Sequence, residues 1–262
     1  MPNIHPTAIV HPNARIAETV TVDAYAVIRE DVSIDEGTSI GPHCLLDNGA
    51  RIGKNCKIHQ GAILATPPQD LKYKNEKTEL FVGDNTTVRE YCTLNRGTTH
   101  SFKTVIGNNC LFMAYVHIPH DGVIGNNVIM GNSVQIGGHS IVGDFAIIGG
   151  LTGLHQFSHV GAHTMVGACV FVQKDVPPYA LAGHSPLRFE GLNSIGLRRR
   201  GFPKETLAQI EKAYHLLYYS GKNITSAVDE IKSTMELIPE VQAILDFIGQ
   251  SKRGIIKPYR GQ

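Results

Sequence analysis

Hydrophobic residues recur at every sixth position of the chain and keep one phase from Ile4 to Val172. The series is broken only at Asp70, Glu76 and His100. Neither a helix, with a period of 3.6, nor a flat strand, with a period of two, produces a repeat of six, whereas stacked coils do. The pattern therefore predicts an all-β coil, a parallel β-helix whose turns lie at the spacing of neighbouring strands.

A second series of small or slim residues lies four positions after the first, as at Ala26, Cys44 and Ala62. Two inward positions in six, separated by an outward one, fit a short strand followed by a turn. Glycine often follows the hydrophobic residue directly, as at Gly137 and Gly149, and we expect it to supply the positive φ of a tight corner. Three such units close a triangular turn of about 18 residues.

Two polar segments interrupt the coil, at 65–81 and 95–105. Each replaces a whole number of six-residue units, because the hydrophobic phase returns intact after it. Loops inserted into a rigid scaffold usually carry function. We therefore expect both insertions to contribute to a binding or catalytic site.

The pattern divides the chain into a β-helix over 1–189 and a small all-α C-terminal domain over 190–262. The coil ends after Asp175-Val-Pro-Pro-Tyr179, because proline cannot continue a strand ladder. The expected helices run from Pro203 to about Ser220, from an N-cap at Thr225, and from Pro239 onward.

Composition narrows the range of partners. The 262 residues carry a net charge of only +1, so we expect no nucleic-acid partner. The first ten residues are already in the six-residue phase, and no apolar run is long enough to span a bilayer, so we expect a cytoplasmic protein without an integral membrane segment.

Cys44, Cys56, Cys92 and Cys110 fall in the slim inward series, so we interpret them as core residues and not as metal ligands or disulfides.

The flat, sparsely charged sides of such a coil expose strand edges and apolar surface. Burying them against copies of the same chain is the usual remedy, and closed cyclic symmetry is its commonest form. For a three-sided prism we expect a homotrimer.

Four of the 13 histidines fall close together when positions are counted around the turn: His117, His120, His139 and His155. Residues on neighbouring turns are roughly 5 Å apart, so these imidazoles are expected to cluster on one side of the coil. Two chemistries remain open, zinc-dependent hydration with a metal between subunits and acyl transfer with a histidine as general base on a hydroxyl. The motif His117-Ile-Pro-His120-Asp121 favours acyl transfer, because a neighbouring carboxylate orients an imidazole and raises its basicity.

At these residues the chain resembles a known family over nearly its whole length, the UDP-N-acetylglucosamine acyltransferases. These hexapeptide-repeat enzymes start lipid A synthesis in Gram-negative bacteria. The motifs that carry the resemblance are Gln69-Asp-Leu-Lys-Tyr73, Leu94-Asn-Arg-Gly97, His117-Ile-Pro-His-Asp121, Gly138-His139, Leu154-His-Gln-Phe157, Asp175-Val-Pro-Pro-Tyr179 and Gly196-Leu-Arg-Arg-Arg-Gly-Phe202. The resemblance implies a left-handed parallel β-helix with a helical tail, a trimer, and no metal or cofactor.

The reaction that the resemblance implies moves an (R)-3-hydroxyacyl group from acyl carrier protein to the 3-hydroxyl of UDP-N-acetylglucosamine. His120 matches the general base, and Asp121 matches the carboxylate that assists it. The backbone N–H of Gly138 matches the hydrogen-bond donor to the developing oxyanion.

Substrate contacts are implied in the same way. The matching residues are Gln69, Asp70 and Lys72 on the first insertion, His117, His139, His155 and Gln156 on the coil, and Asn193, Arg199 and Arg200 in the nucleotide-binding stretch. The family match places Asp70 and Lys72 on a subunit adjoining the general base. Arginine suits that stretch because its guanidinium pairs with phosphate.

The chain departs from the family pattern at two positions. Ile195 stands where relatives often carry an acidic residue, so contacts to ribose or uracil are expected to differ there. Ala168 matches the position that sets acyl-chain length, and its methyl group is expected to shorten the acyl groove relative to glycine. Two alternatives to the main interpretation remain, an N-acyltransferase acting on a 3-amino sugar nucleotide and a γ-type carbonic anhydrase with zinc between subunits.

Overall fold

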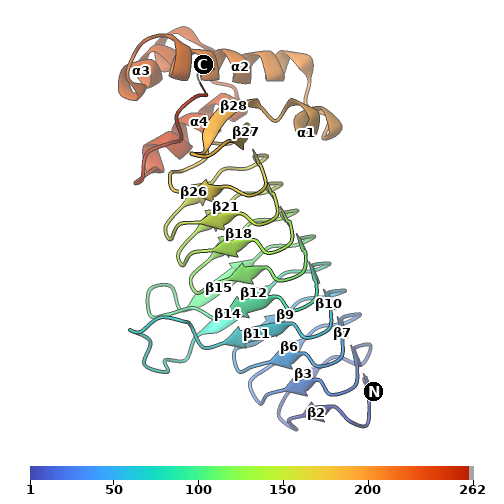
Figure 1. Cartoon of the computed structure of the whole chain (residues 1–262). Helices are drawn as coiled ribbons and strands as arrows, with labels where there is room; N and C mark the ends of the chain where they lie inside the picture. Colours follow the sequence, from blue (N-terminus) through green and yellow to red (C-terminus); the bar gives the residue numbers. More distant parts are fainter. Residues whose placement is uncertain (260–262) are drawn as a thin grey trace.

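Short strands, laid three to a turn, build the first part of the molecule, and helices cover its C-terminal end (Figure 1). The computed structural model describes residues 1–259. The strands form three sheets of 11, 9 and 8 strands, here called sheets A, B and C. Within the coil, successive strands of a sheet pair in parallel, one turn apart, as Ile129 pairs with Leu111 and Ile147. The parallel β-helix expected from the repeat is therefore present.

The strand bounds follow the six-residue repeat. Sheet A contains β1 (Asn3–Ile4), β4 (Thr21–Val22), β7 (Ser39–Ile40), β10 (Lys57–Ile58), β13 (Thr87–Val88), β16 (Leu111–Phe112), β19 (Ile129–Met130), β22 (Ile147–Ile148), β25 (Met165–Val166), β27 (Ala180–Gly183) and β28 (Arg188–Leu192). Sheet B contains β2 (Ile9–Val10), β5 (Val27–Ile28), β8 (Leu45–Leu46), β11 (Ile63–Thr66), β14 (Thr93–Asn95), β17 (His117–Ile118), β20 (Gln135–Ile136), β23 (Gly153–Leu154) and β26 (Phe171–Val172). Sheet C contains β3 (Arg15–Ile16), β6 (Ser33–Ile34), β9 (Ala50–Ile52), β12 (Glu79–Val82), β15 (Lys103–Ile106), β18 (Val123–Ile124), β21 (Ile141–Val142) and β24 (His159–Val160).

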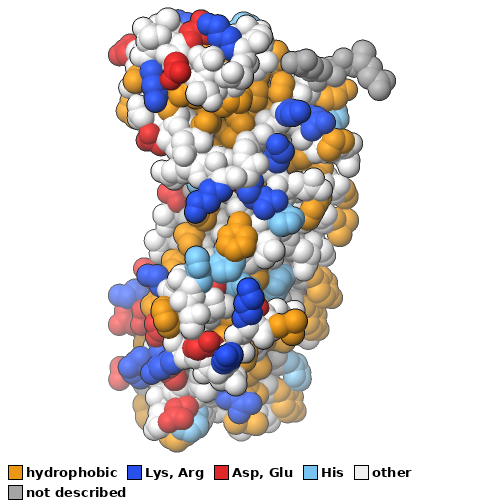
Figure 2. All heavy atoms as spheres, turned by 90° about the vertical axis from the view of Figure 1, so that its left-hand side faces the viewer, with side chains coloured by type: hydrophobic (Ala, Val, Ile, Leu, Met, Phe, Trp, Pro, Cys, Tyr) orange, Lys and Arg blue, Asp and Glu red, His pale blue; other side chains and the backbone are white. Residues whose placement is uncertain are grey.

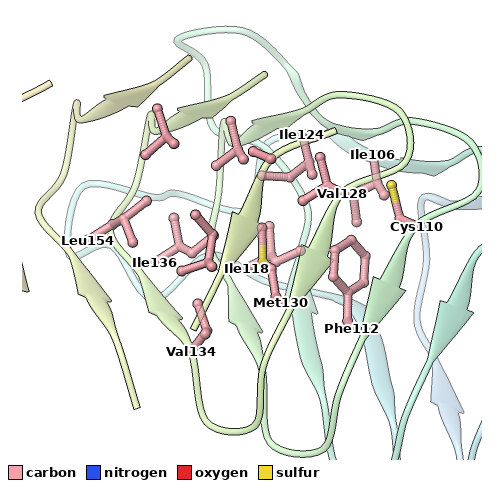
Figure 3. Packing of buried hydrophobic residues seen from close by; sticks show 14 of the residues in the cluster. Ile106, Cys110, Phe112, Ile118, Ile124, Val128, Met130, Val134, Ile136 and Leu154 are labelled. Atoms are coloured by element: carbon pink, nitrogen blue, oxygen red, sulfur yellow. The ribbon is translucent and has the colours of Figure 1, made fainter. Parts of the chain in front are cut away.

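The core is a column of hydrophobic side chains inside the coil. Figure 3 shows them pointing inward from successive turns, among them Phe112, Ile118 and Met130. The slim series fills the space between them, and its four cysteines are buried, as expected. Burial raises the pKa of Cys44 to about 11, so this thiol is unreactive at neutral pH.

The glycines that follow the hydrophobic positions have a different role from the expected one. Their φ angles are not positive; the positive angles lie two residues later, on residues such as Asn127, Ser133 and Phe145. A Cβ at Gly137 would lie 2.4 Å from the backbone nitrogen of Gln156 on the next turn. These glycines therefore permit close stacking of neighbouring turns, and side-chain-bearing residues occupy most of the left-handed corners, with Gly37, Gly49 and Gly61 among the exceptions.

Strands extend into both polar insertions. The end of β11 and the whole of β12 shorten the first insertion to a loop over 67–78, and β14 and β15 shorten the second to 96–102. Both loops leave the same side of the coil, which is the left-hand side in Figure 1.

The C-terminal part begins with a hairpin. Strand β27 pairs in parallel with β25 and antiparallel with β28, and β28 runs across the expected division at 189/190. The helices that follow are α1 (Ser194–Arg199), α2 (Lys204–Tyr219), α3 (Ile224–Thr234) and α4 (Pro239–Gln250). No helix among residues 1–259 is long and apolar enough to cross a membrane.

Two details of the helices differ from expectation. The N-cap of α3 is Asn223, whose side chain accepts a hydrogen bond of 2.9 Å from Ser226 N, and Thr225 lies inside the helix. The six-residue helix α1 was not predicted, since it is too short to show a helical period; its N-cap is Asn193. The starts expected for α2 and α4 agree with the structure within one residue.

Candidate active site

The edge where sheet B turns into sheet C, here called the BC edge, carries a stack of functional side chains. Asp121, His139 and Phe157 occupy the same corner position on three successive turns, with φ angles of 57°, 60° and 61°. The rings of His139 and Phe157 stack at 4.4 Å with an angle of 3° between their planes. The edge faces the viewer in Figure 2, where histidine side chains gather near the inserted loops.

His120 and Asp121 form a hydrogen-bonded pair at this edge, with 2.8 Å between Nδ1 and Oδ2. Asp121 also accepts hydrogen bonds from the hydroxyl groups of Thr98 (2.6 Å) and Ser101. Burial alone would raise the pKa of Asp121, but the hydrogen bonds from Ser101, Thr98 and His120 outweigh it and lower the pKa to about 2. An ionised carboxylate can only accept, so Nδ1 of His120 carries the proton and Nε2 is left as a base.

Gly138 lies directly against the basic end of His120. A Cβ at Gly138 would lie 2.7 Å from both Cε1 and Nε2 of the His120 ring. Gly138 is buried, and its backbone N–H donates to no acceptor among residues 1–259. The absence of a side chain thus leaves a backbone donor beside the base, which suits a developing oxyanion.

His139 is held by rings on three sides. Besides stacking on Phe157, its ring meets the rings of His100 and His120 edge-on, at 4.6 and 4.9 Å. Its Nδ1 is buried without a hydrogen-bond partner among the described residues and lies 3.7 Å from Asp121 Oδ2. Burial lowers the pKa of His139, although the charge of Asp121 opposes this, so this imidazole is neutral at pH 7.

His117 and His155 complete the group of imidazoles. On β17, Nδ1 of His117 lies 2.7 Å from the hydroxyl oxygen of Thr93, and burial lowers the pKa of His117. His155 donates from Nδ1 to the backbone oxygen of Gln156 at 2.9 Å. His155 and Gln156 follow β23, and Phe157 N donates to the backbone oxygen of Gly138 at 2.9 Å, so this turn lies directly beside Gly138.

The first loop leaves the coil at the same BC edge, between β11 and β12. Asp70 is one of the charges that raise the pKa of His139 in its own chain. The family resemblance implied that Asp70 acts from an adjoining subunit, and this stays a prediction. Asp70 Oδ1 accepts a 2.9 Å hydrogen bond from the backbone of Lys72, and the side chains of Lys72 and Gln69 are exposed to solvent.

Arg96 anchors this loop to the coil. Its Nε donates to the hydroxyl of Tyr73 at 3.1 Å, and its Nη1 donates to the backbone oxygen of Ala65 at 2.9 Å. Two motifs that are separate in sequence, those containing Tyr73 and Arg96, are therefore one structural unit.

The residues matched to the nucleotide lie on a different edge, where sheet C turns into sheet A, here called the CA edge. Asn193 caps α1 and donates from Nδ2 to the backbone oxygen of His163 at 2.9 Å. Arg200 donates from Nη2 to the backbone oxygen of Phe145 at 3.0 Å, and Arg199 is exposed. One chain does not bring these residues to His120, and no pattern in the sequence places α1 on an edge.

Ala168 lies on the third edge, where sheet A turns into sheet B, here called the AB edge. It lines an almost wholly apolar groove of about 460 Å³. The groove is also lined by Met113, Ile129, Ile147 and Leu151. Its chemistry suits a hydrocarbon chain.

The imidazole cluster also bears on the metal alternative. Ligand atoms of His120, Asp121 and His139 lie within 4.8 Å of one another. This set holds two imidazoles and not three, and both oxygens of Asp121 already accept hydrogen bonds from Thr98 and Ser101. The donor set fits the orientation of a histidine better than the coordination of zinc.

Three residues of the second loop contribute to the cluster and were not predicted: Thr98, His100 and Ser101. The one sequence signal was His100, which breaks the six-residue series. Positions inside an insertion cannot be counted around the turn, so their neighbours could not be inferred.

The lowered pKa of Asp121 predicts an acid-sensitive contribution to stability. Its usual pKa of 3.8 falls to about 2 in the folded protein, so its stabilising effect is complete above pH 4 and is lost as the pH falls toward 2. We expect the free energy of unfolding of the wild type to exceed that of Asp121→Asn more at pH 5 than at pH 3. Urea unfolding of both proteins at the two pH values measures this, and a constant difference would contradict it.

Two family models match the chain. One, described as UDP N-acetylglucosamine O-acyltransferase, domain 2, matches residues 175–256. The other, bacterial transferase hexapeptide (six repeats), matches residues 103–138. The two matches fall on the helical part and on the coil, respectively.

Similar proteins cover nearly the whole chain. A protein from Chlorobaculum parvum named acyl-(acyl-carrier-protein)–UDP-N-acetylglucosamine O-acyltransferase is 50% identical and covers 99% of both chains. One of the same name from Thiobacillus denitrificans is 45% identical and covers 98% of this chain and 100% of its own. The solved structure of LpxA from Acinetobacter baumannii is 40% identical, with a TM-score of 0.94 over 97% of this chain and 99% of that one. The expectation of a left-handed β-helix is confirmed by this agreement.

Proposed function

The chain belongs to the acyl-(acyl-carrier-protein)–UDP-N-acetylglucosamine O-acyltransferase family, and we propose that it moves an (R)-3-hydroxyacyl group from acyl carrier protein to the 3-hydroxyl of UDP-N-acetylglucosamine. This is the first step of lipid A biosynthesis. The observation that carries the proposal is the pair of His120 and Asp121, with Gly138 against Nε2 of His120.

The reaction follows from that geometry. Nε2 of His120 takes the proton of the sugar hydroxyl as its oxygen attacks the thioester carbonyl carbon. The carbonyl oxygen becomes negatively charged and accepts a hydrogen bond from the backbone N–H of Gly138. The C–S bond then breaks, the carrier leaves as a thiol after receiving the proton from His120, and an ester remains on the sugar. Asp121 stays ionised and stabilises the imidazolium that forms between the two steps.

The remaining residues of the BC edge form the sugar site. His139 contacts the base, His117, His155 and Gln156 come from β17 and from the turn after β23, and Gln69, Asp70 and Lys72 lie on the first loop. Neutral imidazoles accept and donate hydrogen bonds to sugar hydroxyls without adding charge. Lys72 is an exposed cation, which suits it to the diphosphate.

Lys72→Ala is expected to raise the KM for UDP-N-acetylglucosamine with little change in kcat, because its charge serves binding and not the chemical step. Initial rates at varied sugar-nucleotide concentration measure this. Lys74→Ala, which removes another exposed lysine of the same loop, is the control. An unchanged KM in Lys72→Ala would remove this residue from the site.

A homotrimer would unite the three edges of the coil. The general base lies on the BC edge, Arg199 and Arg200 on the CA edge, and Ala168 on the AB edge, so neighbouring copies could combine them into one site. The AB edge also exposes a column of large side chains that a copy could cover: Tyr25, Tyr91, Tyr115 and Leu151. We expect light scattering to give three times the chain mass of 28.5 kDa, and the mass of a single chain would contradict the trimer.

The free thiols favour a cytoplasmic location of the protein. All five cysteines are free, as is usual in a reducing compartment. Cell fractionation followed by immunodetection tests this assignment.

The acceptor and the acyl length are decided by one experiment. The protein is incubated with UDP-N-acetylglucosamine and, separately, its 3-amino analogue, each with hydroxyacyl carrier proteins of several lengths, and the products are identified by mass. We expect an O-acyl product from UDP-N-acetylglucosamine and a preferred length set by Ala168. Product from the amino sugar alone would identify an N-acyltransferase, and no product from any pair would overturn the proposed function.

A further inference from the structure

The second loop binds the carboxylate of the catalytic pair from four directions. Thr98 donates from its hydroxyl to Asp121 Oδ2 at 2.6 Å and from its backbone nitrogen to Oδ1 at 3.1 Å. Ser101 donates to Oδ1 from its hydroxyl and, at 3.2 Å, from its backbone nitrogen. The Asp121 side chain is only 1% exposed, so these protein groups take the place of water around it.

These contacts determine which imidazole forms a hydrogen bond with the Asp121 carboxylate. Oδ2 of Asp121 lies 2.8 Å from Nδ1 of His120 and 3.7 Å from Nδ1 of His139. The Thr98 hydroxyl binds the same oxygen. The Nδ1 atom of His139 is buried and has no hydrogen-bond partner among the described residues. It therefore competes with Nδ1 of His120 for a hydrogen bond to Oδ2 of Asp121.

We propose that Thr98 and Ser101 are positioning residues, which fix the Asp121 carboxylate so that it orients His120 and not His139. The inference rests on the proposed function, because it assumes that His120 is the base. Without the Thr98 hydroxyl, Oδ2 can turn toward His139. His120 then loses the acceptor that holds the proton on Nδ1, and Nε2 is no longer reliably the free nitrogen.

The loop is suited to this task by its place in the fold. It replaces part of the turn between β14 and β15, and Asp121 lies at the corner between β17 and β18, on the next turn of the coil. Phe102 N donates to the backbone oxygen of Thr98 at 2.7 Å, which closes the loop on itself. Because β14 pairs with β17 and β15 with β18, both ends of the loop are fixed relative to the catalytic pair.

Thr98→Val keeps the size of this buried side chain and removes its hydroxyl. We expect kcat to fall about 10- to 100-fold, the usual loss for a group that orients a catalytic ligand or base, with the KM for UDP-N-acetylglucosamine unchanged. Ser101→Ala should lower kcat in the same direction, and Thr98→Ser should restore it. Thr99→Val is the matched control, because Thr99 is exposed on the same loop and should leave kcat unchanged.

Two further measurements separate positioning from a general structural role. In an Asp121→Asn background, Thr98→Val should cause no additional loss, because there is no longer a carboxylate to direct. In protein labelled with ¹⁵N-histidine, the His120 signals, assigned with His120→Ala, should move from the Nδ1–H tautomer toward a mixture in Thr98→Val. The resonance measurement does not depend on turnover, so it tests the inference even where the assigned substrate proves wrong.

Normal kcat in Thr98→Val would overturn the inference. So would an equal loss in the Asp121→Asn background, or His120 resonances identical to those of the wild type. A His120→Ala variant with normal turnover would instead overturn the proposed function, so the two failures are distinguishable.

Discussion

Replacing His120 with alanine is expected to lower kcat by a factor of about 100 or more, because no other group takes the proton from the sugar hydroxyl. His139 is the nearest imidazole, but its Nδ1 lies 3.7 Å from Asp121 and its ring is fixed against Phe157. It therefore cannot take over the position of the base. Steady-state rates with UDP-N-acetylglucosamine and a hydroxyacyl carrier protein measure the loss.

The variant is expected to remain folded, since His120 lies on a turn and not in the core. Its melting temperature and oligomeric mass should match those of the wild type. His215→Ala removes an exposed imidazole on α2 and is the control, with an unchanged kcat. A His120→Ala variant within a few-fold of wild-type turnover would show that another group is the base.

The second large effect is expected for Gly138→Ala. The added Cβ would lie 2.7 Å from Nε2 of His120, closer than real contacts allow, and the ring cannot move aside without breaking its hydrogen bond to Asp121. A displacement on the order of 1 Å at a catalytic group costs roughly a hundredfold in rate. We expect kcat to fall by about that factor while the KM for UDP-N-acetylglucosamine changes little.

Gly249→Ala provides the comparison, because a Cβ there meets nothing within 4 Å. It should leave both kcat and the melting temperature unchanged. Normal turnover in Gly138→Ala would mean that the His120 ring is free to adjust, and it would remove the geometric argument for Gly138 as the oxyanion donor.

The core was predictable because a period of six leaves few possible folds. Ile118, Ile136 and Leu154 are buried where their phase placed them. The role of the glycines was not predictable, since an absent side chain can serve either a positive φ or a close contact. The packing of neighbouring turns decides between the two, as at Gly137, where a Cβ would lie 2.4 Å from the backbone nitrogen of Gln156.

The candidate site was predictable only where the phase is unbroken. His120 and His139 come together because their positions can be counted around the turn. Thr98 and Ser101 lie in an insertion of irregular length, so their contact with Asp121 has no counterpart in the periodicity. Arg200 follows the end of the coil, and its edge is set by packing against Phe145, which no local pattern encodes.

The close stacking of glycine-bearing turns limits how this scaffold can change. A deletion or insertion within the coil keeps each residue on its own edge and sheet only if it removes or adds a whole turn of 18 residues, as between Ile129 and Ile147, so the height between two points on the coil changes in steps of roughly 4.8 Å. Finer adjustment must come from single side chains, such as a methyl group at Ala168. A change in the length of the acyl chain that this architecture accepts would therefore come in large steps from the number of turns and in small steps from the volume of individual edge residues.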